Sequence, residues 1–133
     1  MGGVAYVDSS ALLKIAIHEA ETPALEADFA ARDGLVTSRL AVLECRRAAR
    51  RLLRGRALHS MEQVLEAVYL IEITSAILER AAAAEPPILR SLDAIHLATA
   101  LSIDDPALEI ITYDRRFAEA ASTSGLHVVQ PGI

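Results

Sequence analysis

The sequence predicts an α/β protein in which a parallel sheet is flanked by helices on both faces. Segments with helical periodicity alternate along the whole chain with short apolar runs typical of buried strands. Strands separated by helices usually pair in parallel and hold the helices against the sheet. A length of 133 residues and an apolar fraction of 53% suit one domain with its own core, so we expect a single domain over residues 1–133.

Capping residues, glycines and prolines divide the first half of the chain. Thr22 followed by Pro23 predicts a helix cap and a first-turn proline. Gly34 and Gly55 are expected to end helices. In order, the predicted elements are a strand at 4–7, helices at about 10–19 and 22–32, a strand at 35–37 and a helix at 39–54.

The second half follows the same alternation. Ser60 with a glutamine three residues later resembles a capping box, and Thr74 and Ser91 predict two further caps. The pair Pro86-Pro87 breaks the chain between helices. The predicted elements are a short helix that includes Leu65, a strand at 69–73, helices at 75–84 and 92–103, a strand at 108–112, a helix at 115–124 and a last strand at 128–129.

Composition limits the possible partners and compartments. The net charge of −5 means that the protein as a whole does not attract nucleic acid. An RNA-binding role therefore needs a local basic patch and bound cations. No membrane-length apolar run and no basic leader are present, so we expect a cytoplasmic protein with no membrane partner. Cys45 is the only cysteine, which agrees with a reducing compartment, and we expect it to pack as a small apolar side chain.

Four acidic residues stand where they can converge. Asp8 directly follows the first predicted strand, and Asp114 follows the fourth. The carboxyl ends of parallel strands meet at one edge of a sheet, so both acids are expected there. Asp93 lies near the start of its helix, close to the same edge. Glu44 lies about 9 Å along its helix, from where a glutamate can reach back towards the edge.

Three of these acids also have a purely structural interpretation. Asp8 and Asp114 can simply cap the helices that follow them. Glu44 can be an exposed residue paired with Arg47 or Arg51 at helical spacing.

Asp93 fits no such interpretation, because its helix is apolar on nearly every face and an unpaired buried carboxylate is costly. Clustered carboxylates suit Mg²⁺ or Mn²⁺, which activate water and stabilise charge on a phosphodiester. Zinc is disfavoured because the four histidines are scattered and Cys45 has no partner motif. His96, three residues after Asp93, is expected to be packed and hydrogen-bonded.

Four segments in combination resemble the PIN-domain family, specifically its VapC-type toxins. Their order and spacing match over almost the whole chain. The segments are residues 6–12 (YVDSSAL), 37–44 (TSRLAVLE), 91–100 (SLDAIHLATA) and 112–117 (TYDRRF). The resemblance implies a five-stranded parallel sheet and a Mg²⁺-dependent endoribonuclease that hydrolyses RNA with metal-activated water. It also implies a homodimer that is neutralised by a cognate small DNA-binding antitoxin, whose tail lies across the active-site groove.

The same resemblance assigns functions to individual residues. It implies that the catalytic, metal-binding quartet is Asp8, Glu44, Asp93 and Asp114. Ser9 and Thr112 occupy positions where the family often has a hydroxyl beside the metal. Some PIN domains carry a further acid shortly after the last one, where this chain has Arg115 and Arg116. We therefore expect one well-held Mg²⁺, with Mn²⁺ as a substitute.

A dense basic tract follows Glu44 in the sequence. It comprises Arg46, Arg47, Arg50, Arg51, Arg54 and Arg56. Helical spacing places several of these arginines on shared faces. We interpret the patch, with Arg46, Arg47, Arg50 and Arg51 as its main candidates, as binding RNA phosphates or an acidic antitoxin segment. The alternative is a solvated face with ion pairs.

Three other functions are possible for an α/β domain of this size. A phosphorylatable receiver domain needs an aspartate after a central strand and a late lysine, but the third strand ends without an aspartate and Lys14 lies in the first helix. A haloacid-dehalogenase-like phosphatase needs an aspartate where Ser10 stands. A catalytically silent PIN-like binding module stays open, although all four acids are present. The RNA target and the identity of the antitoxin have no signal in the sequence.

Overall fold

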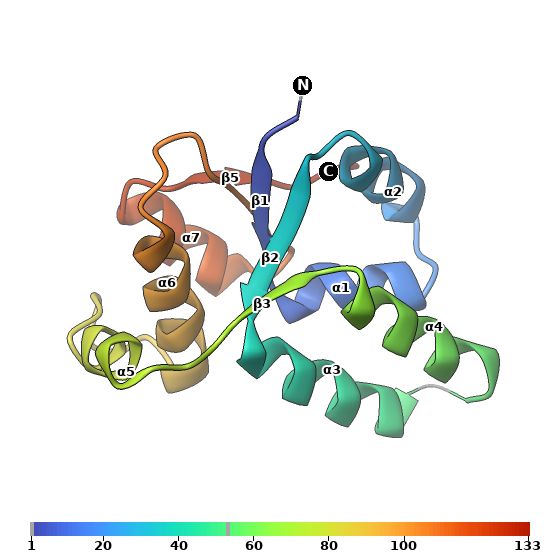
Figure 1. Ribbon diagram of the computed structural model, residues 1–133, viewed down its shortest axis with the longest axis horizontal. Helices are drawn as coiled ribbons and strands as arrows, with labels where there is room; N and C mark the ends of the chain where they lie inside the picture. The colour runs from blue at the N-terminus through green and yellow to red at the C-terminus, as the bar shows by residue number, and fades with distance from the viewer. Residues whose placement is uncertain (1, 53) are drawn as a thin grey trace.

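Five parallel strands form the centre of the computed structural model, which describes residues 2–52 and 54–133 (Figure 1). The strand order is β3-β2-β1-β4-β5. The strands are β1 (Val4–Val7), β2 (Gly34–Ser38), β3 (Tyr69–Ile71), β4 (Glu109–Ile111) and β5 (His127–Val129). The sequence-based prediction of a five-stranded parallel α/β fold is confirmed.

The central strand β1 separates the two halves of the sheet. It pairs with β2 on one side, with Tyr6 opposite Val36, and with β4 on the other, with Val7 opposite Ile111. The chain therefore builds outward to β3 first and then returns to the other side of β1 with β4. This reversal is a topological switch point, and in open parallel sheets the crevice at the carboxyl ends of such strands is where sites form.

Helices cover the two faces of the sheet unequally, as Figure 1 shows. One face carries α1 (Ser9–Ala16), α2 (Thr22–Ala30), α3 (Arg39–Leu52) and α4 (Arg56–Glu66). The other carries α6 (Ser91–Ile103) and α7 (Arg115–Thr123), with α5 (Ser75–Ala82) packed on α6. Successive β1 residues point to opposite faces, so Ala5 and Val7 enter the first core and Tyr6 enters the second. In the described part of the chain, every helix falls short of the length and apolarity that a membrane crossing requires.

Several predicted helix boundaries in the first half are wrong. Helix α1 ends at Ala16, and Gly34 begins β2 instead of ending α2. Helix α3 is described as far as Leu52, and its predicted extension to 54 crosses residue 53, which lies outside the described residues. Thr22 is the first residue of α2, and the cap position belongs to Glu21.

The second half has its own corrections. Ser60 lies inside α4, which begins after Gly55, a glycine with a φ of 55°. That positive φ suits a residue without a Cβ, so Gly55 turns the chain between α3 and α4. Thr74 caps α5 through Ile77 N–H as predicted, whereas Ser91 is the first residue of α6 and the cap position is held by Arg90.

Thr22 joins α1 to α2 instead of capping a helix. Its buried hydroxyl donates to the backbone oxygen of Lys14 at 2.7 Å and accepts from the backbone N–H of Glu19 at 2.9 Å. The Lys14 carbonyl belongs to the last turn of α1, where the helix leaves carbonyls unpaired, and Glu19 lies in the turn that follows. One side chain therefore fixes the turn between two helices.

Replacing this hydroxyl tests the link. We expect Thr22→Val to lower the free energy of unfolding by about 1–3 kcal/mol, because buried polar groups lose their partner. Thr22→Ser keeps the hydroxyl and loses one methyl group, for about 0.8 kcal/mol. Urea denaturation of both variants measures the difference, and a Thr22→Val protein as stable as Thr22→Ser contradicts this role.

Candidate active site

Asp8 is buried at the carboxyl end of β1, where it is 4% exposed. Its carboxylate accepts hydrogen bonds from the hydroxyls of Ser10 at 2.6 Å and Thr112 at 2.5 Å, and from the backbone N–H of Ala11 at 3.1 Å. Burial raises the pKa of the Asp8 carboxyl above its ordinary value, and the hydroxyl bonds oppose that rise. The bond from Ala11 also makes Asp8 the N-cap of α1, so the capping interpretation is confirmed.

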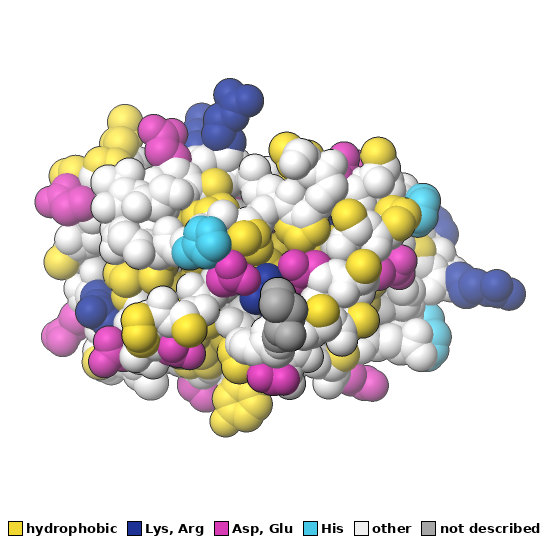
Figure 2. Space-filling view, turned by 90° about the horizontal axis from the view of Figure 1, so that it is seen from above, with side chains coloured by type: hydrophobic (Ala, Val, Ile, Leu, Met, Phe, Trp, Pro, Cys, Tyr) yellow, Lys and Arg dark blue, Asp and Glu magenta, His cyan; other side chains and the backbone are white. Residues whose placement is uncertain are grey.

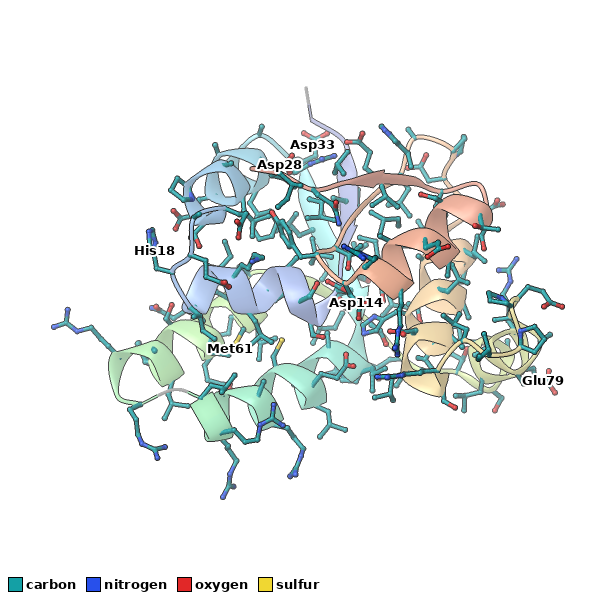
Figure 3. The ribbon with its side chains drawn as sticks, turned by 180° about the vertical axis from the view of Figure 1, so that it is seen from behind. His18, Asp28, Asp33, Met61, Glu79 and Asp114 are labelled. Atoms are coloured by element: carbon teal, nitrogen blue, oxygen red, sulfur yellow. The ribbon has the colours of Figure 1, made fainter. Side chains whose placement is uncertain are left out.

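Asp114 stands beside Asp8 at the end of β4. Its Oδ1 accepts from the backbone N–H groups of Arg116 and Phe117, which makes it the N-cap of α7. Its own N–H donates to the Thr112 hydroxyl at 3.0 Å, and that hydroxyl donates to Asp8. Thr112 therefore joins the two acids, and Figure 3 shows Asp114 between the facing ends of α1 and α7.

Asp93 is the third residue of α6, and its side chain forms no hydrogen bond or ion pair with any other described residue. Burial raises the pKa of its carboxyl, and the negative charges of Asp114, Asp8 and Glu44 raise it further. Four carboxylates thus lie within electrostatic range of one another, as the strand ends predict. Their mutual repulsion favours the binding of a cation.

Glu44 reaches the site from α3 through a histidine. Its Oε1 lies 2.6 Å from Nε2 of His96, and Nδ1 of His96 lies 2.5 Å from the Tyr6 hydroxyl. The Ser38 N–H donates to the same hydroxyl at 3.2 Å. The prediction that His96 is packed and hydrogen-bonded is confirmed. The alternative pairing of Glu44 with nearby arginines of its own helix is wrong.

Two hydrogen-bonding residues escaped the sequence analysis. Tyr6 is fully buried in an otherwise aliphatic strand, and burial raises the pKa of its phenol, which keeps the group neutral. A buried tyrosine hydroxyl usually has a partner, which was the available signal. Ser10, not Ser9, bonds Asp8, and Ser10 also accepts from the backbone N–H of Tyr113. Among the described residues, Ser9 makes no hydrogen bond through its hydroxyl.

The donor set suits a hard divalent cation. All four side chains offer oxygen, and in the described chain none of the four forms an ion pair with lysine or arginine. No three described His, Cys, Asp or Glu side chains are placed to hold a metal as they stand. Glu44 and Asp114 each use one oxygen on a protein donor, which leaves Oε2 and Oδ2 as available ligands. Cys45 is not a candidate, because burial raises the pKa of its thiol to about 12.

Several charged side chains at the opposite, amino end of the strands form ion pairs. Figure 2 looks onto this end, where acidic, basic and histidine side chains gather. Arg32 bonds both Asp28 at 2.9 Å and Glu109 at 2.6 Å, and Nδ1 of His127 lies 2.9 Å from Glu109. In the described part of the chain, no such ion pair to lysine or arginine reaches the four acids at the carboxyl end.

The arginine tract lies on the outer side of α3, from which nitrogen-tipped side chains extend away from the molecule in Figure 3. Arg46 pairs with Glu62 of α4 at 2.9 Å, so this arginine ties two helices together. Arg47, Arg50 and Arg51 are exposed, and no ion pair of theirs occurs in the described part of the chain. The ion-pair alternative is therefore correct for Arg46 alone among these four.

A model of the PIN domain matches residues 5–122, which covers most of the chain. The chain therefore belongs to the PIN-domain family, as a member of its VapC type. Ribonuclease VapC35 of Mycobacterium tuberculosis is 40% identical over 131 residues, 96% of each chain. Ribonuclease VapC46 of the same organism is 37% identical over 127 residues, 95% of this chain and 96% of the relative.

Solved structures agree with this assignment. A toxin–antitoxin complex from Klebsiella pneumoniae matches with a TM-score of 0.71 and 26% identity, over 96% of this chain and 97% of the other. VapC20 of Mycobacterium tuberculosis matches with a TM-score of 0.75 over 96% and 99% of the two chains. Its identity of 18% makes it a likeness of fold.

The charge on Asp93 should cost stability in the metal-free protein. The pKa of Asp93 in the folded protein is raised above its value in the unfolded chain. Protonated Asp93 therefore contributes stability below the unfolded pKa, and this contribution is lost as pH rises through the folded pKa. We expect Asp93→Asn in EDTA to be at least as stable as wild type at about pH 7.5, with the advantage shrinking towards about pH 5. Thermal melts at both pH values check this.

Asp104→Asn is the matched control, because Asp104 is an exposed residue at the end of α6 and its loss also removes one negative charge. A metal-free Asp93→Asn protein that melts well below wild type at the higher pH contradicts the electrostatic account. Such a result would mean that the Asp93 carboxylate stabilises the fold by pairing with another group of the protein.

Proposed function

We propose that this protein is a Mg²⁺-dependent endoribonuclease and the toxin of a toxin–antitoxin pair. The observation that carries the proposal is the unbalanced negative charge at the switch point between β1 and β4. Asp93 is the central case, since it is partly buried without a protein partner. The relatives named ribonuclease, which align over nearly the whole chain, support the assignment to RNA.

The residues divide into ligands and supports. Asp8, Asp93, Asp114 and Glu44 would hold the ion, and the hydroxyls of Ser10 and Thr112 fix the orientation of Asp8. A bound Mg²⁺ supplies an activated water and stabilises charge on the phosphodiester. Because Asp8 and Asp114 also cap α1 and α7, both acids are tied to the ends of rigid helices and keep their places when RNA binds.

The exposed arginines of α3 supply the local positive charge that the proposed substrate requires. Arg47, Arg50 and Arg51 lie on the helix that also carries Glu44, within two turns of it. A chain with a net charge of −5 repels RNA overall, so phosphate contacts must come from such a patch.

The partners follow from the same family assignment. The Klebsiella pneumoniae structure is a toxin–antitoxin complex, which supports a cognate antitoxin as the natural inhibitor. We propose that a small DNA-binding antitoxin covers the acidic groove, that the toxin is a homodimer and that it acts in the cytoplasm. A silent binding module is the alternative, and cleavage assays separate the two.

The first functional test removes ligand charge and keeps side-chain shape. Asp8→Asn and Asp93→Asn should each lower RNA cleavage by about 100-fold or more, because metal-assisted charge stabilisation is worth several kcal/mol. EDTA should stop wild-type cleavage, and Mg²⁺ or Mn²⁺ should restore it. Single-turnover cleavage of a mixed RNA pool measures both effects.

Asp104→Asn is again the control and should cleave at the wild-type rate. Wild-type cleavage that persists in EDTA contradicts metal dependence. A folded Asp93→Asn protein with full activity removes Asp93 from the site. No cleavage by the wild type under any divalent ion supports the silent module.

The second functional test concerns the arginines. Changing Arg47, Arg50 and Arg51 together to alanine should weaken RNA binding and lower the salt dependence of log K by about 0.7 for each lost phosphate contact. Fluorescence anisotropy at several salt concentrations, with catalytically inactive protein, gives both quantities. Arg80→Ala, on α5, is the comparison for loss of an exposed arginine elsewhere. An unchanged salt slope assigns the patch to solvent or to the antitoxin.

A further inference from the structure

We propose that His96 is a positioning residue for the metal site: its Nε2–H holds Oε1 of Glu44 and leaves Oε2 available as a ligand. This inference rests on the proposed metal-dependent function and goes beyond it, because it concerns a side chain that does not itself bind the ion. It is carried by one continuous chain of hydrogen bonds from the sheet to α3.

The chain of bonds indicates which ring nitrogen carries the proton. The Tyr6 hydroxyl accepts from the Ser38 N–H at 3.2 Å, so its single proton is left for another acceptor. Nδ1 of His96, at 2.5 Å, is that acceptor, because the other ring nitrogen, Nε2, faces a carboxylate oxygen of Glu44, which can only accept a hydrogen bond. An accepting Nδ1 is unprotonated, so the ring proton of neutral His96 is on Nε2. It is donated to Glu44 at 2.6 Å.

Aromatic neighbours fix the plane of the ring. The Tyr6 ring meets it edge to face, with centroids 5.8 Å apart and planes at 76°. The Phe117 ring lies 5.9 Å away at 52°. His96 is only 3% exposed, so the ring cannot swing without moving both neighbours. A donor held this rigidly defines where the Glu44 carboxylate can lie.

Glu44 needs such a support more than the other three acids. Asp8 and Asp114 are short side chains fixed as helix caps, whereas Glu44 has a longer, flexible side chain in the middle of α3. Without a donor, repulsion from the other carboxylates would turn it towards solvent. Hydrogen bonds to a metal-binding carboxylate orient it, and losing such a partner typically costs 10–100-fold in metal affinity.

The competing explanation is that the imidazole only fills space in the core. Two substitutions separate these roles because they place an amide at different points of the ring. His96→Gln puts its amide nitrogen about where Nε2 lies, within reach of Glu44. His96→Asn puts its amide about where Nδ1 lies, so it faces Tyr6 and leaves Glu44 without a donor.

Mn²⁺ is the probe, with free Mn²⁺ followed by electron paramagnetic resonance during titration of metal-free protein. We expect His96→Asn to bind Mn²⁺ about tenfold more weakly than wild type, or worse, and His96→Gln to recover most of the loss. His127→Asn is the control, since it removes another histidine–glutamate contact at the amino end of the strands, remote from the acids. Its affinity should equal that of wild type.

A second measurement needs no variant at the site. The ¹⁵N shifts of the His96 ring in the metal-free wild type should show a protonated Nε2 and an unprotonated Nδ1. A ring that carries its proton on Nδ1 and none on Nε2 overturns the proposal, and this holds even if His96→Asn fails to fold in thermal melts.

The remaining outcomes are equally decisive. A folded His96→Asn protein with wild-type Mn²⁺ affinity overturns the positioning role and leaves the proposed nuclease intact. Equal losses in folded His96→Gln and His96→Asn mean that ring packing matters, not the Nε2 donor, and this too overturns the role. If the wild type neither binds Mn²⁺ nor cleaves RNA with a divalent ion, the proposed function fails, and this inference fails with it.

Discussion

Burying the Asp8 carboxyl group inside the protein is the constraint on which the architecture of the site depends. A carboxylate that is 4% exposed is costly to bury unless donors surround it. The donors come from the start of α1 and from the residue after β4, which are adjacent only because β4 pairs with β1. The strand order that forms the switch point therefore also brings the hydrogen-bond donors to the Asp8 carboxyl group.

Two other acids are held by hydrogen bonds on either side of β1. On the β4 side, the Thr112 hydroxyl accepts from the backbone N–H of Asp114. On the β2 side, Glu44 is hydrogen-bonded to His96, which is bonded in turn to Tyr6. Every strand that borders β1 thus contributes to holding one negative charge near another. At the amino ends of the strands, by contrast, Arg32 forms ion pairs with Asp28 and Glu109, whereas in the described chain no lysine or arginine pairs with the four acids of the site.

Much of this could be predicted from the sequence, for identifiable reasons. Strand existence, parallel order and the acids at strand ends follow from patterns that repeat every few residues and from the geometry of parallel sheets. Thr22 and Ser60 were misassigned because the local cap signal does not report whether tertiary contacts use the hydroxyl or leave it inside a helix. The Glu44–His96 bond joins residues 52 positions apart, so no local pattern contains it.

The double use of Asp8 and Asp114 as helix caps and acids has an evolutionary consequence. Asparagine and serine cap helices about as well as aspartate. A descendant could therefore lose its charge at either position and keep α1, α7 and the core around them. The fold then depends mainly on the buried apolar residues, whereas the proposed catalysis depends on the charge of a few carboxyl groups. Inactive members of such a lineage would keep the shape that an inhibitor recognises and could act as decoys for it.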